Sequence, residues 1–454
     1  MRRAIYWLVA GGVLLLAVYF FGDKLTRNAT LASLEVVGNI ATRNLPDDIA
    51  GGFHRIPIEL GQLDHNIFQA TGIGNTQLIQ TNAGFVLFDS GIAIQAAEHI
   101  NLLRPLAVGP LTHIILSHSH ADHIGGAKFW LEKDTLIVAH REFPEEQRYL
   151  KELQPYFWQR NRTLFPWLPE APPDNPIISY GGIEPDILVD ENDFVFHQGG
   201  IDFHVLSTPG AEGADNISLW LPERKMLFSG DFFGPLFPQF PNLFTMRGEK
   251  MRKPVEYISS LNKIIALEPE VIVPSHHSPI HGQANIRAAM IRIRDAVQHV
   301  HDETIRGMNE GKTVYQLMRE IKLPPELSLT EEHGKISWAV RSIWEYYATW
   351  FHFESTTELY PVPISDIYPD LAKVAGIDAL LQSAETSFEN NEPVNALHFL
   401  EIILAADAHN RNALQLRLQV LQVMLKNAVS GGNNFEKDYL RQRIALTQAH
   451  LSQS

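Results

Sequence analysis

Residues 112–126 read THIILSHSHADHIGG, a short apolar strand that gives way abruptly to histidine and aspartate. Four side chains of metal-binding type follow in close succession: His118, His120, Asp122 and His123. Alternate side chains of an extended chain point to the same side, so His118 and His120 can converge on one ion. Asp122 and His123 lie past the strand, where a turn can direct them to a second ion. Imidazole and carboxylate groups suit zinc and similar divalent ions, so this stretch predicts a metal site rather than a histidine-rich surface loop.

The composition is that of an ordinary globular protein. The chain has 454 residues, of which 45% are hydrophobic and 20% are charged, and its formal net charge is -15 at pH 7. This length is sufficient for two or three domains. The negative charge argues against nucleic acid as a partner, because nothing offsets the repulsion of phosphates. The sequence contains no cysteine, which excludes disulfides, thiolate metal ligands and cysteine nucleophiles.

An uncharged apolar run, AIYWLVAGGVLLLAVYFFG, covers residues 4–22 and follows Arg2 and Arg3. Its length is about what a helix needs to cross the hydrocarbon core of a membrane. A cleaved signal peptide is the alternative, because it also carries positive charge ahead of an apolar core. The run lacks a small-x-small cleavage site, which favours a transmembrane anchor in residues 1–25. Because the two arginines should stay in the cytoplasm, we expect an inner-membrane anchor with the catalytic domain in the periplasm or outside the cell.

Residues 26–285 alternate short β runs with helical patterns, which indicates a layered α/β domain. The β run at residues 84–88 ends at Asp89, which could either cap the next helix or orient a metal ligand from behind. Three later strands also end in ligand types: Glu212 after the strand at 203–206, Asp231 after the strand at 226–230, and His276 with His277 after the strand at 271–274. Several strands that deliver ligands at the same end predict a common site.

The His-x-His-x-Asp-His order of residues 118–123 resembles the signature of the metallo-β-lactamase superfamily. The resemblance implies an αββα sandwich with a dinuclear metal centre. Counting the ligand types assigns His118, His120 and Glu212 to one ion, Asp122, His123 and His276 to the other, and Asp231 between them. Two divalent ions, expected to be zinc, about 3.5–4 Å apart would hold a bridging hydroxide as the nucleophile at neutral pH.

Two aspartates of this set, Asp122 and Asp231, are expected to be catalytic as well as ligating. His276 is preferred to His277 because Pro-Ser-His-His is similar in position to the Pro-Gly-His-Gly of the superfamily.

The residue after the Pro-Gly turn indicates one branch of the superfamily. Most members of the superfamily have histidine there, whereas this chain has Ala211 and then Glu212. This resembles the alkylsulfatase branch, whose enzymes hydrolyse sulfate esters of detergents such as dodecyl sulfate. The run NLFTMRGEKMR at 242–252 is similar to the family run that supplies an arginine for the sulfate. The resemblance implies this role for Arg247, with Arg252 as a nearby helper, and a guanidinium fork suits a tetrahedral oxyanion. A surface ion pair is the alternative for both.

The chain departs from the alkylsulfatase pattern at several places. Asp231 replaces the usual glutamate, the segment 144–185 does not clearly reproduce the family's substrate-pocket run, and the chain stops before the family's third, sterol-carrier-like domain. These departures favour an alternative substrate, namely a carboxylic ester, a lactone or a phosphoester. The aromatic loop at 232–240 could line a channel for an alkyl chain or pack in the core.

Residues 286–454 carry helical patterns nearly to the end. The stretch from His333 to Tyr347 resembles the dimerisation domain of the alkylsulfatases, which implies a homodimer. Tyr346 is a candidate for contact with sulfate, although an aromatic stripe at helical spacing is more often core. Residues 376–426 are similar to tetratricopeptide-like helical hairpins.

Taken together, these patterns predict a membrane-anchored dinuclear zinc hydrolase that cleaves a small sulfate ester with an apolar tail at either the S–O or the C–O bond. A hydrolase of another ester class is the first alternative. A non-catalytic, membrane-tethered interaction protein is the second, and the complete ligand set disfavours it.

Overall fold

The computed structural model describes residues 57–165, 168, 170 and 182–453. Its backbone divides into two compact units whose segments interleave along the chain. The first unit contains the described residues up to Trp158, those from 168 to Phe237, and Glu256–Ile291. The second unit contains 159–165, Pro238–Val255 and 292–453.

The first unit is built on two β-sheets. One has seven strands in the order β1 to β7: Leu60–Asp64, Ile67–Ala70, Thr76–Thr81, Gly84–Phe88, Leu111–Ile115, Leu136–His140 and Ile187–Val189. Its first four strands pair antiparallel, and β4 to β7 pair parallel. The other sheet has six strands in the order β13-β12-β11-β10-β9-β8, from Ile280–His281, Val271–Pro274, Met226–Gly230, Ile217–Leu221, Ile201–Ser207 and Phe194–Gln198. In it only β11 and β12 pair parallel.

The hydrophobic pattern of the strands explains how the two sheets stack. Successive side chains of a strand point to opposite faces, and β4 is apolar at every position after its glycine. Val86 and Phe88 pack into the core between the two sheets, together with residues such as Phe203 and Phe228 of the second sheet. Phe85 and Leu87 face the other way, into a core shared with helices. A strand that is buried on both faces is typical of the parallel part of a layered α/β fold.

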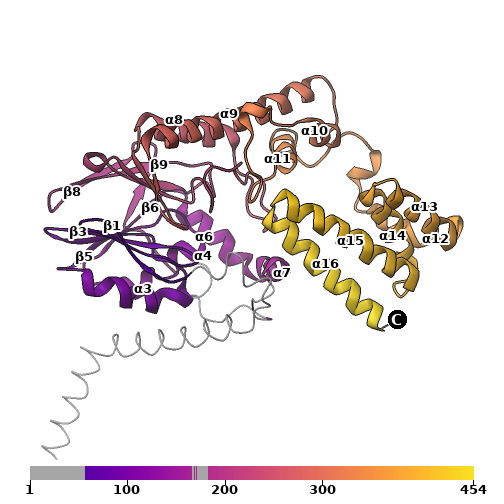
Figure 1. The fold of residues 1–454 in the computed structure, drawn as a ribbon, viewed down its shortest axis with the longest axis horizontal. Coiled ribbons are helices and arrows are strands. Elements are labelled where there is room, and N and C mark those ends of the chain that lie inside the picture. The colour runs from indigo at the N-terminus through magenta and orange to yellow at the C-terminus, as the bar shows by residue number, and fades with distance from the viewer. Residues whose placement is uncertain (1–56, 166–167, 169, 171–181, 454) are drawn as a thin grey trace, which may run out of the picture. The chain divides into compact units, whose positions relative to one another are not determined.

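Helices cover the outer faces of this sandwich. The helices α3 (Ala96–Leu103), α4 (Ala121–Ile124), α5 (Ala127–Trp130) and α6 (Phe143–Glu152) supply Leu103, Ile124, Trp130 and Phe143 to the core against the first sheet. Figure 1 shows α3 on the outer side of the first sheet and α8 (Pro254–Ala266) on the outer side of the second. The predicted αββα arrangement is therefore present in the described residues.

The second unit is helical, as predicted. Its elements are α10 (Val314–Glu320), α11 (Ile336–Ala348), α12 (Tyr368–Ala375), α13 (Ile377–Glu389), α14 (Pro393–Ala406), α15 (Arg411–Gly431) and α16 (Asn434–Gln453). The helices α7 (Gln154–Leu164) and α9 (Gln283–Asn309) contribute residues to both units. Ala384 and Ala396 share one buried cluster with Leu400, and their small side chains allow α13 and α14 to approach closely. The long helices α15 and α16 lie side by side (Figure 1) and pack through Leu421 and Leu440.

The predicted transmembrane helix, and the inner-membrane location that depended on it, need correction. Among the helices of the described residues, none combines the length and the apolar character needed to cross a membrane. The 27-residue helix α9 is long enough, but it carries charges such as Arg292 and Asp295, which are costly in hydrocarbon. The apolar run at residues 4–22, on which the prediction rested, lies outside the described residues.

Candidate metal centre

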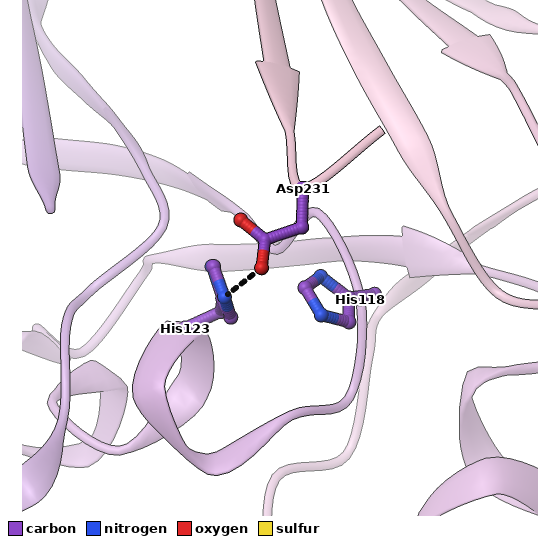
Figure 2. Close-up of side chains that lie close together, drawn as sticks. All are labelled: His118, His123 and Asp231. Atoms are coloured by element: carbon purple, nitrogen blue, oxygen red, sulfur yellow. Dashed lines mark ion pairs between the residues drawn. The ribbon is translucent and has the colours of Figure 1, made fainter. Parts of the chain in front are cut away.

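The predicted ligands of the first unit meet at one edge of the sandwich. His118 and His120 lie in the loop after β5, Asp122 and His123 lie in the short helix α4, and Asp231 directly follows β11. Figure 2 shows the Asp231 carboxylate beside the imidazoles of His118 and His123. Their ligand atoms lie within 4.8 Å of one another, so the three could hold one ion.

Distances between ligand atoms show how compact the cluster is. The Oδ2 atom of Asp231 lies 3.3 Å from Nε2 of His123 and 3.0 Å from Nε2 of His276. The Oδ2 atom of Asp122 lies 3.5 and 3.6 Å from the same two nitrogens. Asp122, His123 and His276 therefore form a second group with ligand atoms within 4.8 Å. Asp231 contacts both histidines of that group, and it also belongs to the group with His118 and His123.

The remaining ligands, His120 and Glu212, connect to the cluster through His118. Nε2 of His118 is 2.8 Å from Nδ1 of His120, and Nδ1 of His120 is 4.0 Å from Oε2 of Glu212. Glu212 is buried in the loop after β9. The structure thus brings together all seven predicted ligands, which lie in segments that follow the C-terminal ends of β5, β9, β11 and β12.

The loop after β12 distinguishes between the two adjacent histidines. His276 is buried and directs Nε2 to Asp231. His277 is exposed and has a left-handed backbone, with φ at +60°. Only His276 lies in the cluster.

A glycine allows the two ligand loops to approach. Gly230, immediately before Asp231, has φ at +56°, and a Cβ atom there would lie 2.4 Å from Cβ of Ser117. Any other residue would push the end of β11 away from the loop that carries His118. Glycine at position 230 is therefore required by close packing as well as by backbone conformation.

The charges in the cluster perturb one another strongly. Burial alone would raise the pKa of Asp231, but the imidazoles of His276 and His123 outweigh it and hold that pKa well below its usual range. Burial alone would lower the pKa of His123, but Asp231, Asp122 and Asp89 raise it well above the ordinary histidine value. The pKa of His276 is raised in the same way, chiefly by Asp231 against the effect of burial. Ionised carboxylates at this site therefore attract positive charge.

The donor set fits divalent metal ions. Among the described residues, the buried Nε2 of His123 and Oδ1 of Asp231 have no hydrogen-bond partner. A buried polar atom without a partner is costly, and both atoms lie where an ion would satisfy them. Neutral imidazoles and carboxylates are the ligands of zinc and related ions.

Asp89 supports the cluster from behind. Its buried carboxylate accepts hydrogen bonds from Nδ1 of His123 at 2.8 Å and from the backbone N–H and hydroxyl of Ser117 at 2.7 and 2.8 Å. The hydroxyl of Ser275 donates to it at 2.5 Å. The next helical turn begins after Ile92 without a side-chain cap. Of the two roles considered for Asp89, the structure thus supports orientation of a ligand.

The predicted substrate residues lie in the second unit. Arg247 and Arg252 share Glu249, with nitrogen–oxygen distances of 2.9 Å for each pair. Arg252 is buried and also donates to the carbonyl of Asn242 at 2.5 Å. Tyr346 lies in α11, partly exposed, with its ring beside that of Tyr347. The arginines are thus clustered, and Glu249, which the sequence reasoning missed, links them.

Sequence reasoning also missed a buried carboxyl group at Asp215. Burial, assisted by the nearby Glu146, raises the pKa of Asp215 to about 7. No motif marks this residue, because its burial depends on how the loop after β9 folds back. The aromatic loop at 232–240 forms core packing where it belongs to the first unit: Phe232 stacks on Tyr257, and Phe233 packs edge-on against Phe232.

Two family models match this chain, one in each of its two parts. Residues 70–276 match the family model of the metallo-β-lactamase superfamily, and residues 313–441 match the family model of alkyl sulfatase dimerisation. The chain is 28% identical over 336 residues to a linear primary-alkylsulfatase of Pseudomonas sp. (strain ATCC 19151), a match that covers 68% of this chain and 62% of the relative. It is 23% identical over 392 residues to an alkyl/aryl-sulfatase of Saccharomyces cerevisiae, covering 80% of this chain and 60% of the relative. The chain thus spans about three-fifths of the length of these relatives.

A solved structure shares the fold. A stereoselective inverting sec-alkylsulfatase from Pseudomonas sp. superposes with a TM-score of 0.72 at 19% sequence identity, covering 87% of this chain and 65% of the other. The metallo-β-lactamase fold implies that the chain binds divalent metal, and the His and Asp groups at the strand ends are the candidate ligands.

Proposed function

This chain joins a metallo-β-lactamase domain to an alkyl sulfatase dimerisation domain, and from this premise we propose that it is a metal-dependent hydrolase of alkyl sulfate esters. The observation that carries the proposal is the buried cluster in which His118, His123 and Asp231 direct ligand atoms to one point. Alkylsulfatases among its relatives supply the substrate class.

Two divalent ions, expected to be zinc, are the proposed cofactors. His118, His120 and Glu212 would hold one ion, Asp122, His123 and His276 would hold the other, and Asp231 would lie between them. When bound, such ions activate water at neutral pH and polarise the ester.

The two aspartates of the cluster differ in exposure to solvent. The side chain of Asp122 is 23% exposed, whereas that of Asp231 is 8% exposed. Burial would raise the pKa of both carboxyl groups, but His123 and His276 outweigh it and hold both pKa values well below the usual range, so both carboxylates are ionised and Asp122 is the more accessible of the two. Because both carboxylates contact His123 and His276, they also fix the orientation of these imidazoles.

Arg247 is the proposed sulfate-binding residue, with Arg252 assisting. Both guanidinium groups pair with the single carboxylate of Glu249, so the three groups together carry one net positive charge. A sulfate monoester carries one negative charge, and a guanidinium fork matches its oxygens. Tyr346 is proposed as an additional contact to the substrate.

The test is hydrolysis of matched dodecyl esters by the metal-loaded protein. We expect turnover of dodecyl sulfate, with little turnover of dodecyl phosphate or dodecyl acetate. Glu212→Ala should lose turnover together with bound metal. Arg247→Ala should lose turnover while it retains the metal. Preference for the phosphate or the acetate would overturn the sulfatase assignment and favour a hydrolase of another ester class.

The helical unit is the proposed site of homodimer formation. It matches the alkyl sulfatase dimerisation family, and a stretch within the match exposes large apolar side chains, including Trp350 at 65%, Phe353 at 87% and Ile364 at 70%. Burial of such groups favours association. Light scattering should give the mass of two chains for the wild type and of one chain for Phe353→Ser combined with Ile364→Ser.

A further inference from the structure

Three buried carboxamide side chains lie against the loop that carries His276, residues 274–277, here termed the His276 loop. Gln69 in β2 and Gln77 in β3 face each other across the antiparallel pair, and Asn75 immediately precedes β3. All three side chains are almost completely buried. Because 197 to 208 residues separate them from the loop carbonyls that they contact, only the tertiary fold brings the two segments together.

The amides donate to carbonyl oxygens of the His276 loop. The side chain of Asn75 donates to His277 at 2.9 Å, and its backbone N–H donates to Ser275 at 2.8 Å. The side chains of Gln69 and Gln77 donate to His277 at 3.2 Å and to Pro274 at 3.3 Å, respectively. The carbonyl groups of Pro274, Ser275 and His277 thus all accept hydrogen bonds from the segment 69–77.

The orientation of the two glutamines follows from their partners. A backbone carbonyl oxygen can only accept a hydrogen bond, so each glutamine must present its NH₂ group to the loop. Gln77 also donates from Nε2 to Oε1 of Gln69 at 3.1 Å. This bond occupies the oxygen of Gln69 and leaves its NH₂ group for the carbonyl of His277. The amides therefore form a directed chain of donors that ends on the loop.

These hydrogen bonds stabilise the His276 loop in two ways. Its carbonyls lie at and just after the end of β12, and buried carbonyls need donors. Its backbone also takes a left-handed turn at His277, which most residues adopt only when their surroundings impose it. The consequence is that His276 lies buried with Nε2 at 3.0 Å from Asp231.

We propose that Gln69, Asn75 and Gln77 act as positioning residues for the metal ligand His276, and we term them the amide clamp. The proposal rests on the proposed metal site. The clamp holds the backbone of the loop, whereas Asp89 holds the side chain of Ser275 within it. These two supports reach the loop through different groups. Loss of the clamp should therefore weaken binding of the ion that His276 holds and leave binding of the ion at His118 and His120 unchanged.

The test is metal binding by Gln77→Met and Asn75→Leu, which remove the donors and keep similar side-chain volumes. Competition with a chromophoric chelator would measure the affinity of each zinc ion in the full chain. We expect one of the two ions to bind about 10–100-fold more weakly, as for other groups that support metal ligands, and the other to bind as in the wild type. In the Co²⁺-loaded protein, the visible spectrum of one site should change.

Gln198→Met is the matched control, because Gln198 is also buried in the first unit but bonds to Thr112, at 2.7 Å. We expect it to retain both affinities. The milder variant Gln69→Met leaves the contact of Gln77 with Pro274. It should lower the affinity for the same ion by a smaller factor.

Three outcomes would overturn the proposal. One is unchanged binding of both ions in Gln77→Met and Asn75→Leu. Another is loss of both ions together with a lower thermal midpoint of the metal-free protein, because the amides would then only stabilise the domain. The third is an equal loss in Gln198→Met. Absence of sulfatase turnover in a wild-type protein that binds two ions would overturn the proposed function and leave the amide clamp standing.

Discussion

The carboxylate of Asp89 accepts a hydrogen bond from Nδ1 of His123 at 2.8 Å, and both side chains are fully buried. In the neutral imidazole, this bond places the proton on Nδ1 and leaves Nε2 for an ion. The same nitrogen is the one that has no hydrogen-bond partner among the described residues. The pair therefore selects the tautomer in which His123 can bind a metal ion.

Replacement of Asp89 by asparagine should change the preferred tautomer of His123. The NH₂ group of the introduced side chain would face hydrogen-bond donors, so His123 would favour the opposite tautomer, with its proton on Nε2. We expect zinc affinity to fall about 10–100-fold, as measured by chelator competition. Asp202→Asn is the matched control, because Asp202 forms a similar pair with His197 at 2.7 Å on the exposed surface. Equal losses in the two variants would contradict the prediction.

Metal binding should release protons near neutral pH. The pKa values of His123 and His276 are raised in the metal-free protein, chiefly by Asp231 against the effect of burial. Both imidazoles must lose a proton before Nε2 can bind an ion, so metal affinity should rise with pH and level off above their raised pKa values. Calorimetric titration with zinc in buffers of different ionisation enthalpy would count the protons. A heat that does not depend on the buffer would contradict this assignment.

His277→Gly should stabilise the metal-free protein. The backbone of His277 has φ at +60°, a conformation that glycine adopts at no steric cost. Relief of strain and the greater entropy of the unfolded glycine chain oppose each other, and we expect a net gain of about 0.5–1 kcal/mol. Denaturation with urea would measure it. The comparison is His197→Gly, at an exposed position of β8, where a loss of about 0.5–1 kcal/mol is expected.

Asp215 should make the metal-free protein less stable as the pH rises. Burial raises the pKa of Asp215 to about 7, so between pH 4 and 7 the folded state binds more protons than the unfolded state. Stability then falls with pH across that window, by about 1.4 kcal/mol per unit at most. Asp215→Asn removes this dependence, so its advantage in free energy of unfolding should grow from pH 5 to pH 8. An advantage that stays constant over this range would contradict the raised pKa.

Much of the first unit could be predicted from local patterns. Apolar runs such as 84–88 indicated strands, and ligand types just after several strands indicated a shared site. This reasoning works because the side-chain period of a strand and the meeting of strand ends at one sheet edge follow from backbone geometry. The predicted membrane anchor is not supported, because no helix of the described residues is long and apolar enough to cross a membrane.

Other features could not be predicted because they depend on contacts between distant segments. Asp89 had two roles open to it, and only its hydrogen bonds with Ser117, His123 and Ser275 select one. The burial of Asp215 and the bonds of Asn75 to the His276 loop have no local signature, since polar residues of this kind are usually exposed.

The sequence alone therefore determined the residue types and their order: the His-x-His-x-Asp-His motif, the strands that carry further ligands, and the helical second half. These depend on covalent neighbours and on backbone periodicity, which can be read along the chain. The tertiary structure alone decided that Asp89 orients His123 and that amides some two hundred residues away hold the His276 loop. The reason is that hydrogen bonds and burial depend on distance in space, which the order of residues does not specify.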